Sequence, residues 1–261
     1  MGEGRLELLG APVDPLTLDE ALDSVDRMIA EGRHGQHASV NAAKVVRMQS
    51  DPELRAAVAG CDLVTADGQP VVWASRLLGR PLPERVAGID LMHGLFARAS
   101  ARGYRVYLLG ARPDVIANAA AALELRHPDV VLAGYRHGYF SRGEEDGVVS
   151  EIAAARPDIL VLALETPQKE LFLARHRETL RVPFAMGVGG SLDVLAGRRR
   201  RAPRWAQHAG LEWAFRLAQE PRRLARRYAV GNVRFAALVA REVFRNRRVA
   251  RGASARGRWA E

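Results

Sequence analysis

The chain of 261 residues is poor in several features that would place it in a familiar class of protein. Its single cysteine, Cys61, cannot form an internal disulfide, which suits a reducing cytosol. No apolar run comes near the roughly 20 residues needed to cross a bilayer. Residues 1–14 lack the basic stretch followed by an apolar stretch that marks a secretory signal. These absences predict a cytoplasmic protein.

Motifs for metal and nucleotide chemistry are missing as well. There is no Asp-x-Asp pair of the kind that holds Mg²⁺ or Mn²⁺ on a sugar nucleotide, and the histidines and Cys61 have no zinc-like spacing. GxSxG and GxxxxGK[ST] are absent. Residues 187–190, GVGG, come closest to the fingerprint GxGxxG, but no acid follows at the expected distance. We therefore expect neither a metal ion nor a cofactor.

Lysine is scarce, and the positive charge gathers at one end. Only Lys44 and Lys169 stand among 39 basic residues, and the net charge is +9. Residues 198–261 hold 18 arginines and 4 glutamates, a net charge of +14, which leaves −5 for residues 1–197. Such a segment favours nucleic acid, anionic lipid headgroups or phosphorylated substrates as partners.

Short apolar runs alternate with amphipathic helical patterns, which predicts an α/β fold of βαβ units with a mostly parallel sheet. Helix starts are marked by Pro52, Pro70 and Pro113, since a first helical turn tolerates proline. Strands are expected at 6–9, 37–40, 63–66, 106–109, 130–133, 159–164 and 184–188, and helices at 18–29, 42–48, 52–58, 70–78, 90–101, 113–125, 144–155 and 168–176.

Three segments are expected along the chain. Residues 1–197 form the α/β core, and residues 198–248 form a basic helical appendage. Its helices are expected at 209–219 and 221–248, the second broken around residues 231–232. Residues 249–261 have no periodicity and are predicted to be a disordered tail.

Two polar motifs follow expected strands, where ligands bind in open α/β sheets. Asp67 and Gly68 come directly after the strand at 63–66. Asp67 could act as a general base or hold a sugar hydroxyl, and the alternative is a turn whose carboxylate caps the next helix. Ser39 and Asn41 end the strand at 37–40, where they could contact a substrate or only cap a helix.

Two further motifs have equally local alternatives. Arg85 and Asp90 stand in RVAGID, which could also be a surface loop with Asp90 as an N-cap. Gly110 stands in LLGARP, where a strand, a glycine turn and a helix start could cradle a phosphate or a nucleoside.

The motif TPQKE follows the strand at 159–164. It places Gln168, Lys169 and Glu170 at a helix N-terminus near the edge of the sheet that binds ligands. The alternative is a helix start with charges that face solvent.

Residues 187–227 combine a glycine turn after a strand with Asp193 and then many arginines. A glycine turn lets backbone N–H groups approach an anion, and arginines supply bidentate donors to phosphates. This stretch is therefore expected to hold a phosphorylated partner.

The order of the motifs over roughly residues 5–228 resembles the WecG/TagA/CpsF family, glycosyltransferase family 26. The motifs are SVNAAKV at 39–45, TADGQPVVWASRLLG at 65–79, RVAGIDL at 85–91, VYLLGARPDV at 106–115, GYF at 138–140, PDILVLALETPQKE at 157–170, GVGGSLDVLAGRRRRAP at 187–203 and GLEWAFRLAQEPRRLARR at 210–227.

The resemblance implies a Rossmann-like core whose C-terminal appendage completes the active site. It implies inverting, metal-independent transfer of a hexose or an N-acetylhexosamine (ManNAc-like) from a UDP-sugar to a polyprenyl-diphosphate-linked acceptor. The products belong to cell-surface polysaccharides or teichoic-acid-type polymers. The protein would sit peripherally on an anionic membrane, at the inner face of the plasma membrane, and no nucleic acid is expected as a partner.

The resemblance also implies roles for single residues. Asp67 matches the proposed catalytic base, and Ser39 stands near the reacting sugar, where many members have threonine. Pocket-lining positions match Asn41 and Arg85. The residues implied at the nucleotide-binding turn are Gly187, Gly189 and Asp193, and those implied to hold the diphosphate are Arg216, Arg223 and Arg226.

The chain departs from the family pattern at residues 163–170, where Lys169 and Gln168 are exchanged and Glu165 replaces a small residue. A carboxylate near a diphosphate repels it unless Lys169 or an arginine neutralises the charge. This departure leaves a catalytically altered family member as one alternative to an active glycosyltransferase, and the basic C-terminal segment leaves a nucleic-acid-binding protein as another.

Overall fold

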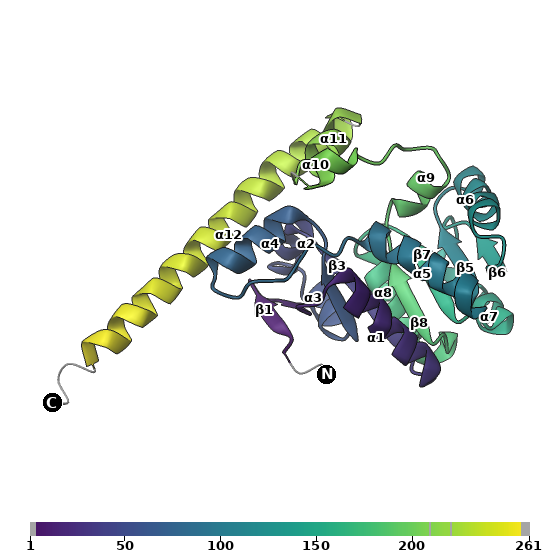
Figure 1. The fold of residues 1–261 in the computed structure, drawn as a ribbon, viewed down its shortest axis with the longest axis horizontal. Coiled ribbons are helices and arrows are strands. Elements are labelled where there is room, and N and C mark those ends of the chain that lie inside the picture. The colour runs from purple at the N-terminus through teal and green to yellow at the C-terminus, as the bar shows by residue number, and fades with distance from the viewer. Residues whose placement is uncertain (1–3, 209, 220, 257–261) are drawn as a thin grey trace.

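A six-stranded parallel sheet forms the centre of the protein (Figure 1). The computed structural model describes residues 4–208, 210–219 and 221–256, without the side chains of residues 204, 208, 216, 222–228 and 247–256. The strand order is β4-β3-β8-β7-β5-β6, and every pairing in this sheet is parallel. The strands are β3 (Gly35–Val40), β4 (Leu63–Ala66), β5 (Arg105–Gly110), β6 (Val131–Arg136), β7 (Ile159–Ala163) and β8 (Phe184–Gly187).

Helices cover both faces of the sheet because side chains of the inner strands are apolar in both directions. On β5, Val106 and Leu108 join the core of one face, whereas Tyr107 and Leu109 join the core of the other. The first face carries α1 (Leu18–Ala30), α5 (Gly88–Arg102), α6 (Pro113–Arg126) and α9 (Ser191–Leu195). The second carries α2 (Ala42–Met48), α3 (Pro52–Ala59), α4 (Gln69–Leu77), α7 (Glu145–Ala155) and α8 (Gln168–Leu180).

The α/β fold predicted from the sequence is confirmed, and each of the seven expected strands is present. The sequence pattern missed β2 (Ala11–Val13), which pairs with β1 (Leu6–Leu8) in a small antiparallel hairpin. It also missed α9, α10 (Arg204–His208) and the 3₁₀ turn at Arg142–Glu144. All four elements have three to five residues, so they are too short to show a period.

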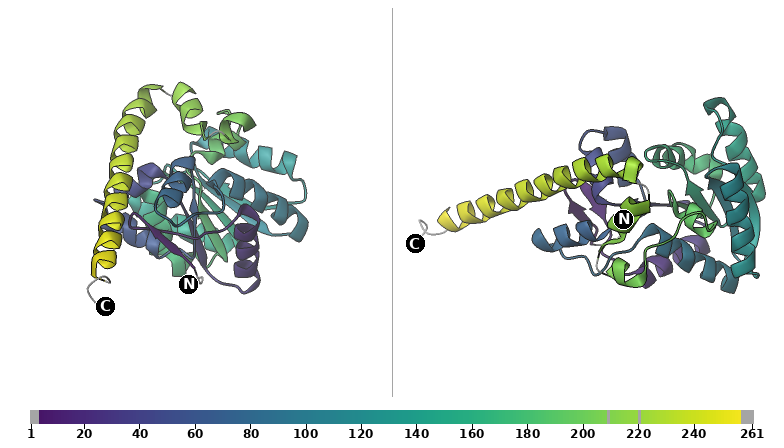
Figure 2. Two further views of the ribbon diagram at one scale, coloured as in Figure 1. Left: turned by 60° about the vertical axis from the view of Figure 1, so that its left-hand side comes forward. Right: turned by 90° about the horizontal axis from the view of Figure 1, so that it is seen from above.

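Three helices, α10, α11 (Glu212–Gln219) and α12 (Pro221–Arg256), form the C-terminal appendage (Figures 1 and 2). The helix α12 packs against α2, and Phe235 and Val239 are buried in the core shared with α2, α3 and α4. The expected break at residues 231–232 is wrong, since α12 is a single helix through Gly231 to Arg256. Packing of its apolar side offsets the roughly 1 kcal/mol that a helical glycine costs. This helix includes residues 249–256 of the expected tail, and residues 257–261 lie outside the described part of the chain.

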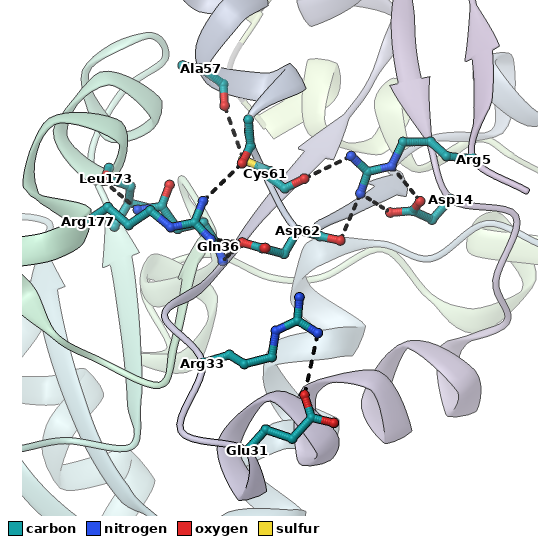
Figure 3. A network of polar contacts seen from close by, with 11 residues as sticks. Arg5, Asp14, Glu31, Arg33, Gln36, Ala57, Cys61, Asp62, Leu173 and Arg177 are labelled. Atoms are coloured by element: carbon teal, nitrogen blue, oxygen red, sulfur yellow. Dashed lines mark hydrogen bonds and ion pairs between the residues drawn. The ribbon is translucent and has the colours of Figure 1, made fainter. Parts of the chain in front are cut away.

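The amino ends of the strands carry a dense set of polar contacts (Figure 3). The Arg5 guanidinium pairs with Asp14 at 2.7 Å and donates to the carbonyls of Cys61 and Asp62. The Asp62 carboxylate accepts from the Gln36 N–H at 2.9 Å and pairs with Arg177 at 2.6 Å. These bonds tie the hairpin, β3, β4 and α8 together at this edge.

Candidate active site

A cavity of about 140 Å³ opens at the opposite edge, where the parallel strands end. One side is formed by the first residues of α2 and α4, and the other by the appendage. The lining residues are Asn41, Ala42, Ala43, Asp67, Gly68, Gln69, Pro70, Arg85, Gln207, Gly210, Glu212, Trp213, Gly231 and Asn232. The structure thus brings Asn41, Asp67 and Arg85 to one pocket, as the sequence predicted for these three.

Asp67 lies directly beyond β4 and lines the pocket. Its N–H donates to the Val40 carbonyl at 2.8 Å, which extends the ladder between β3 and β4 by one residue and fixes the Asp67 backbone. The N-cap position of α4 is Gly68, so Asp67 stands one residue before the N-cap of this helix. Gly68 has φ = 118°, a left-handed conformation that turns the chain sharply from the strand into α4.

The sequence left open whether Asn41 and Ser39 contact a substrate or cap a helix, and the structure places the two residues differently. The Asn41 side chain accepts from the Lys44 N–H at 3.0 Å, so Asn41 caps α2 while it also lines the pocket. Ser39 is buried one position before the end of β3 and lies outside the pocket lining. Its carbonyl accepts from the Lys44 ammonium at 2.6 Å.

Arg85 connects the core to the appendage. Its guanidinium pairs with Glu212 of α11 at 3.0 Å and with Asp90 at 3.5 Å, and Asp90 pairs in turn with Arg201 at 2.6 Å. Asp90 stands in the first turn of α5, whose N-cap is Ala87, so the N-cap interpretation of Asp90 is wrong. Both charges of the Arg85–Glu212 pair are largely buried, with 15% of each side chain exposed.

Several pocket residues escaped the sequence reasoning. One of them belongs to α4 and four belong to the appendage. They are Gln69, Gln207, Glu212, Trp213 and Asn232. Glu212 and Trp213 stand in the motif at 210–227, in which the sequence pattern assigned roles only to arginines. Only the packing of α12 on α2 shows that Asn232 faces the end of β4.

Lys169 and Glu170 lie beneath the surface rather than in the pocket lining. Both are 6% exposed, so the alternative of solvent-facing charges is wrong for them. The Glu170 carboxylate pairs with Lys44 at 2.7 Å and with Lys169 at 3.0 Å. Gln168 and Glu165 are exposed at the start of α8, and Lys169 turns inward to Glu170 and Thr166.

The predicted glycine turns lie at the same edge, at the ends of β5 and β8. Gly110 has φ = 121°, and a Cβ there would lie 2.4 Å from the Ala163 oxygen, so close strand packing alone requires glycine. A Cβ on Gly187 would lie 2.8 Å from Cδ of Lys169. Gly189 has φ = 53°, and Asp193 follows in the first turn of α9, its carboxylate 3.9 Å from Nε of Arg199.

The three arginines expected to hold a diphosphate belong to the appendage. Arg216 is on α11, and Arg223 and Arg226 are on α12. Their side chains lie outside the described part of the chain.

Among the described residues, no three His, Cys, Asp or Glu side chains come together as a metal ion would need. The same residues include no helix long and apolar enough to cross a membrane.

An α/β core with a polar pocket beyond the carboxyl ends of parallel strands defines the class: an open α/β protein with a cavity where such folds bind their ligands. Residues 6–249 match the family described as Glycosyl transferase WecG/TagA/CpsF family. The chain belongs to this family, and its sequence resemblance to it is confirmed. It is accordingly a glycosyltransferase by family.

Proposed function

We propose that the protein is an inverting, metal-independent glycosyltransferase that moves a hexose or N-acetylhexosamine from a UDP-sugar to a polyprenyl-diphosphate-linked acceptor. The observation that carries this proposal is the pocket, in which Asp67, Asn41 and Arg85 of the core face the basic appendage. A carboxylate that follows a strand and opens into a polar pocket is well placed to take a proton from an acceptor hydroxyl.

Asp67 is the proposed general base. The acceptor hydroxyl attacks the anomeric carbon of the donor, its proton passes to the Asp67 carboxylate, and the bond to the UDP oxygen breaks. A positioned base contributes about 10²–10⁴-fold to the rate. Asn41 and Arg85 would hold the sugar and the acceptor, because an amide and a guanidinium donate to hydroxyl and phosphate oxygens.

Arginines and backbone N–H groups are proposed to stabilise the departing UDP. The turns at Gly110, Gly187 and Gly189 stand at the strand ends, and strand spacing puts the ends of β4 and β8 about 10 Å apart. Asp193 is proposed at the nucleotide turn, and Arg216, Arg223 and Arg226 at the diphosphate. Positive groups directed at a leaving phosphate supply the stabilisation that a bound metal gives in other enzymes.

The long helix α12 is proposed to rest on the anionic surface of the inner leaflet. Its outer side carries the exposed apolar residues Val230, Val233 and Phe244, spaced as one stripe, while Phe235 and Val239 pack on the core. Exposed Arg234, Arg241 and Arg245 lie along one side of the stripe. An apolar stripe bordered by arginines is typical of helices that lie in a membrane interface.

Turnover tests the proposed chemistry. We expect UDP release from one of a panel of UDP-GlcNAc, UDP-ManNAc, UDP-glucose and uronic-acid donors, only with a prenyl-diphosphate acceptor and unchanged by EDTA. Asp67→Asn should bind UDP but lose turnover. No release with any donor, together with normal UDP binding, would favour the altered family member. Tight RNA or DNA binding at about 150 mM salt without UDP binding would favour the nucleic-acid alternative.

Vesicle binding tests the membrane contact separately. We expect the protein to sediment with vesicles of phosphatidylglycerol and phosphatidylcholine, and Phe244→Glu to weaken this binding several-fold. Leu125→Glu is the matched control, since Leu125 is an exposed leucine on α6, outside the appendage. Equal losses in both variants would contradict a membrane contact through α12.

A further inference from the structure

The only two lysines of the chain meet at one buried carboxylate. Every other basic residue of the 39 is arginine, so lysine stands at two positions against a strong general preference. Lys44 and Lys169 are each 6% exposed, and both ammonium groups contact Oε1 of Glu170, at 2.7 and 3.0 Å. An ammonium is a compact point charge whose pKa shifts readily on burial, whereas a guanidinium is a larger planar fork that stays charged. We call Lys44, Lys169 and Glu170 the buried lysine cluster.

The buried lysine cluster spans the carboxyl ends of neighbouring strands. Lys44 donates to the Ser39 carbonyl at the end of β3, while Lys169 and Glu170 come from α8, which follows β7. Between β3 and β7 lies β8, whose last residue is Gly187. Because Gly187 has no side chain, the stem of Lys169 passes over it, with Cδ 2.8 Å from where a Cβ would stand. Gly187, which was expected to bind a nucleotide, therefore also leaves the space through which the Lys169 side chain extends towards β3.

Asp67 lies on the other side of the end of β3. Its N–H donates to the carbonyl of Val40, and Lys44 donates to the carbonyl of Ser39, the preceding residue. Successive carbonyls of a strand point to opposite sides, so the two bonds flank the strand. One strand spacing on each side puts Asp67 within about 10 Å of the ammonium groups.

The buried lysine cluster has one positive charge in excess. Although burial alone would raise the pKa of the Glu170 carboxyl, Lys44 and Lys169 hold it below its usual range, so Glu170 is ionised. Burial lowers the pKa of Lys169 to about 8 with help from Lys44, while Glu170 and Asp67 act in the opposite direction. At neutral pH Lys169 is therefore mostly an ammonium and Glu170 a carboxylate.

Two buried titratable groups that interact with the buried lysine cluster leave this excess in place. Burial, with a smaller effect of Lys44, lowers the pKa of His37 on β3 to about 3, so its imidazole is neutral. Burial raises the pKa of the Cys61 thiol to about 12, so it is neutral too. On the pocket side, Arg85 is paired with Glu212 of α11 and with Asp90.

We propose that the excess positive charge of the buried lysine cluster keeps the Asp67 carboxylate ionised, so that Lys169 is a positioning residue that tunes the base through charge rather than by touching substrate. The catalytic role of this tuning rests on the proposed function, in which Asp67 is the general base. The electrostatic claim itself concerns only the titration of Asp67. It also gives a role to the departure at residues 163–170, since the exchange places lysine where it turns inward.

Two substitutions in the buried lysine cluster should shift the titration midpoint of Asp67 in opposite directions. Lys169→Met removes a positive charge and should raise the titration midpoint of Asp67 by about one pH unit. Glu170→Gln removes a negative charge and should lower it by a similar amount. A purely structural role would not give shifts of opposite sign. Arg175→Met is the matched control, since it removes an exposed cation from the same helix.

The midpoint is measured on the full chain by ¹³C NMR of aspartate carboxyl carbons, with the Asp67 resonance identified by its loss in Asp67→Asn. Thermal unfolding is recorded first, and if Lys169→Met does not fold, Lys44→Met replaces it with the same expected upward shift. The acid limb of kcat/KM should move with the NMR midpoint. Unmoved midpoints, or shifts of one sign in both variants, would overturn the proposal. Normal turnover of Asp67→Asn would instead overturn the role of Asp67 as base.

Discussion

The two edges of the parallel sheet both carry charged residues, yet they differ in how those charges are used. At the amino ends, Arg5, Asp14, Asp62 and Arg177 bind one another and the strand backbones (Figure 3). At the carboxyl ends, Asp67 and Arg85 line a pocket, and the buried lysine cluster beside them has a charge in excess. Charges that bond strand ends to one another stabilise the fold, whereas charges that line a cavity stand where a ligand can reach them.

Two aspartates of one strand give the largest expected contrast. Asp62 precedes β4 and Asp67 follows it. Asp67→Asn should lose about 10²–10⁴-fold in turnover, since it removes the proposed base while the backbone bond from the Asp67 N–H to Val40 is kept. Asp62→Asn should unfold at lower urea, because the Gln36 N–H and Arg177 lose a charged acceptor, while the folded protein keeps its turnover. Urea denaturation and turnover are measured on both.

If Asp62→Asn lost turnover at unchanged stability, the division of the sheet into a structural and a functional edge would be contradicted.

The next largest effect is expected from breaking the ion pair between Arg5 and Asp14 at the hairpin. Arg5→Met leaves Asp14 without its cationic partner and deprives two carbonyls of a donor, which should lower the free energy of unfolding by about 3 kcal/mol. Turnover of the folded protein should stay the same. The control is Arg33→Met, since the Arg33–Glu31 pair has 55% and 56% of its side chains exposed and should contribute little. Similar losses in the two variants would show that the charge of Arg5 is not what holds this edge.

The share of the fold and of the candidate site that could be predicted from the sequence differs between the two edges of the sheet. The strands and helices followed from period and turn signals. The positions of Asp67 and Asn41 after strands, and the motif RVAGID around Arg85, pointed to residues that line the pocket. Bonds between residues distant along the chain left no such signal: Arg5 meets Asp62, and Lys44 meets Glu170, through tertiary packing alone. Lys169 and Glu170 were expected near substrate because sequence does not tell a buried helix start from an exposed one.

The middle of the sheet offers a test by pH. His37 lies on β3 between the two edges and bonds Thr65 at 2.9 Å, and its pKa is lowered from 6.5 to about 3 by burial first and by Lys44 second. The unfolded chain therefore takes up a proton below pH 6.5 that the folded protein does not, so stability falls as pH falls. From about pH 6 to about pH 4.5 this group should cost about 2 kcal/mol. His37→Gln, which cannot titrate, should lose that part of the pH dependence in urea titrations.

The half-buried His137 provides the control for this test. His137→Gln is measured beside His37→Gln to show what the replacement of a histidine does by itself. An unchanged pH dependence in His37→Gln would mean that the buried imidazole is protonated in the fold.

The smallest effect concerns the contact between the core and the appendage. Glu212→Gln keeps the shape of the side chain but removes the charge that holds Arg85 at 3.0 Å, so the guanidinium is less fixed over the pocket. We expect KM for the donor to rise about fivefold, near 1 kcal/mol, with a smaller change in kcat. Glu242→Gln, an acid of α12 that pairs with Arg245, should leave both constants unchanged. An unaltered KM in Glu212→Gln would show that Asp90 alone positions Arg85, and the appendage would then complete the pocket by its shape rather than by its charge.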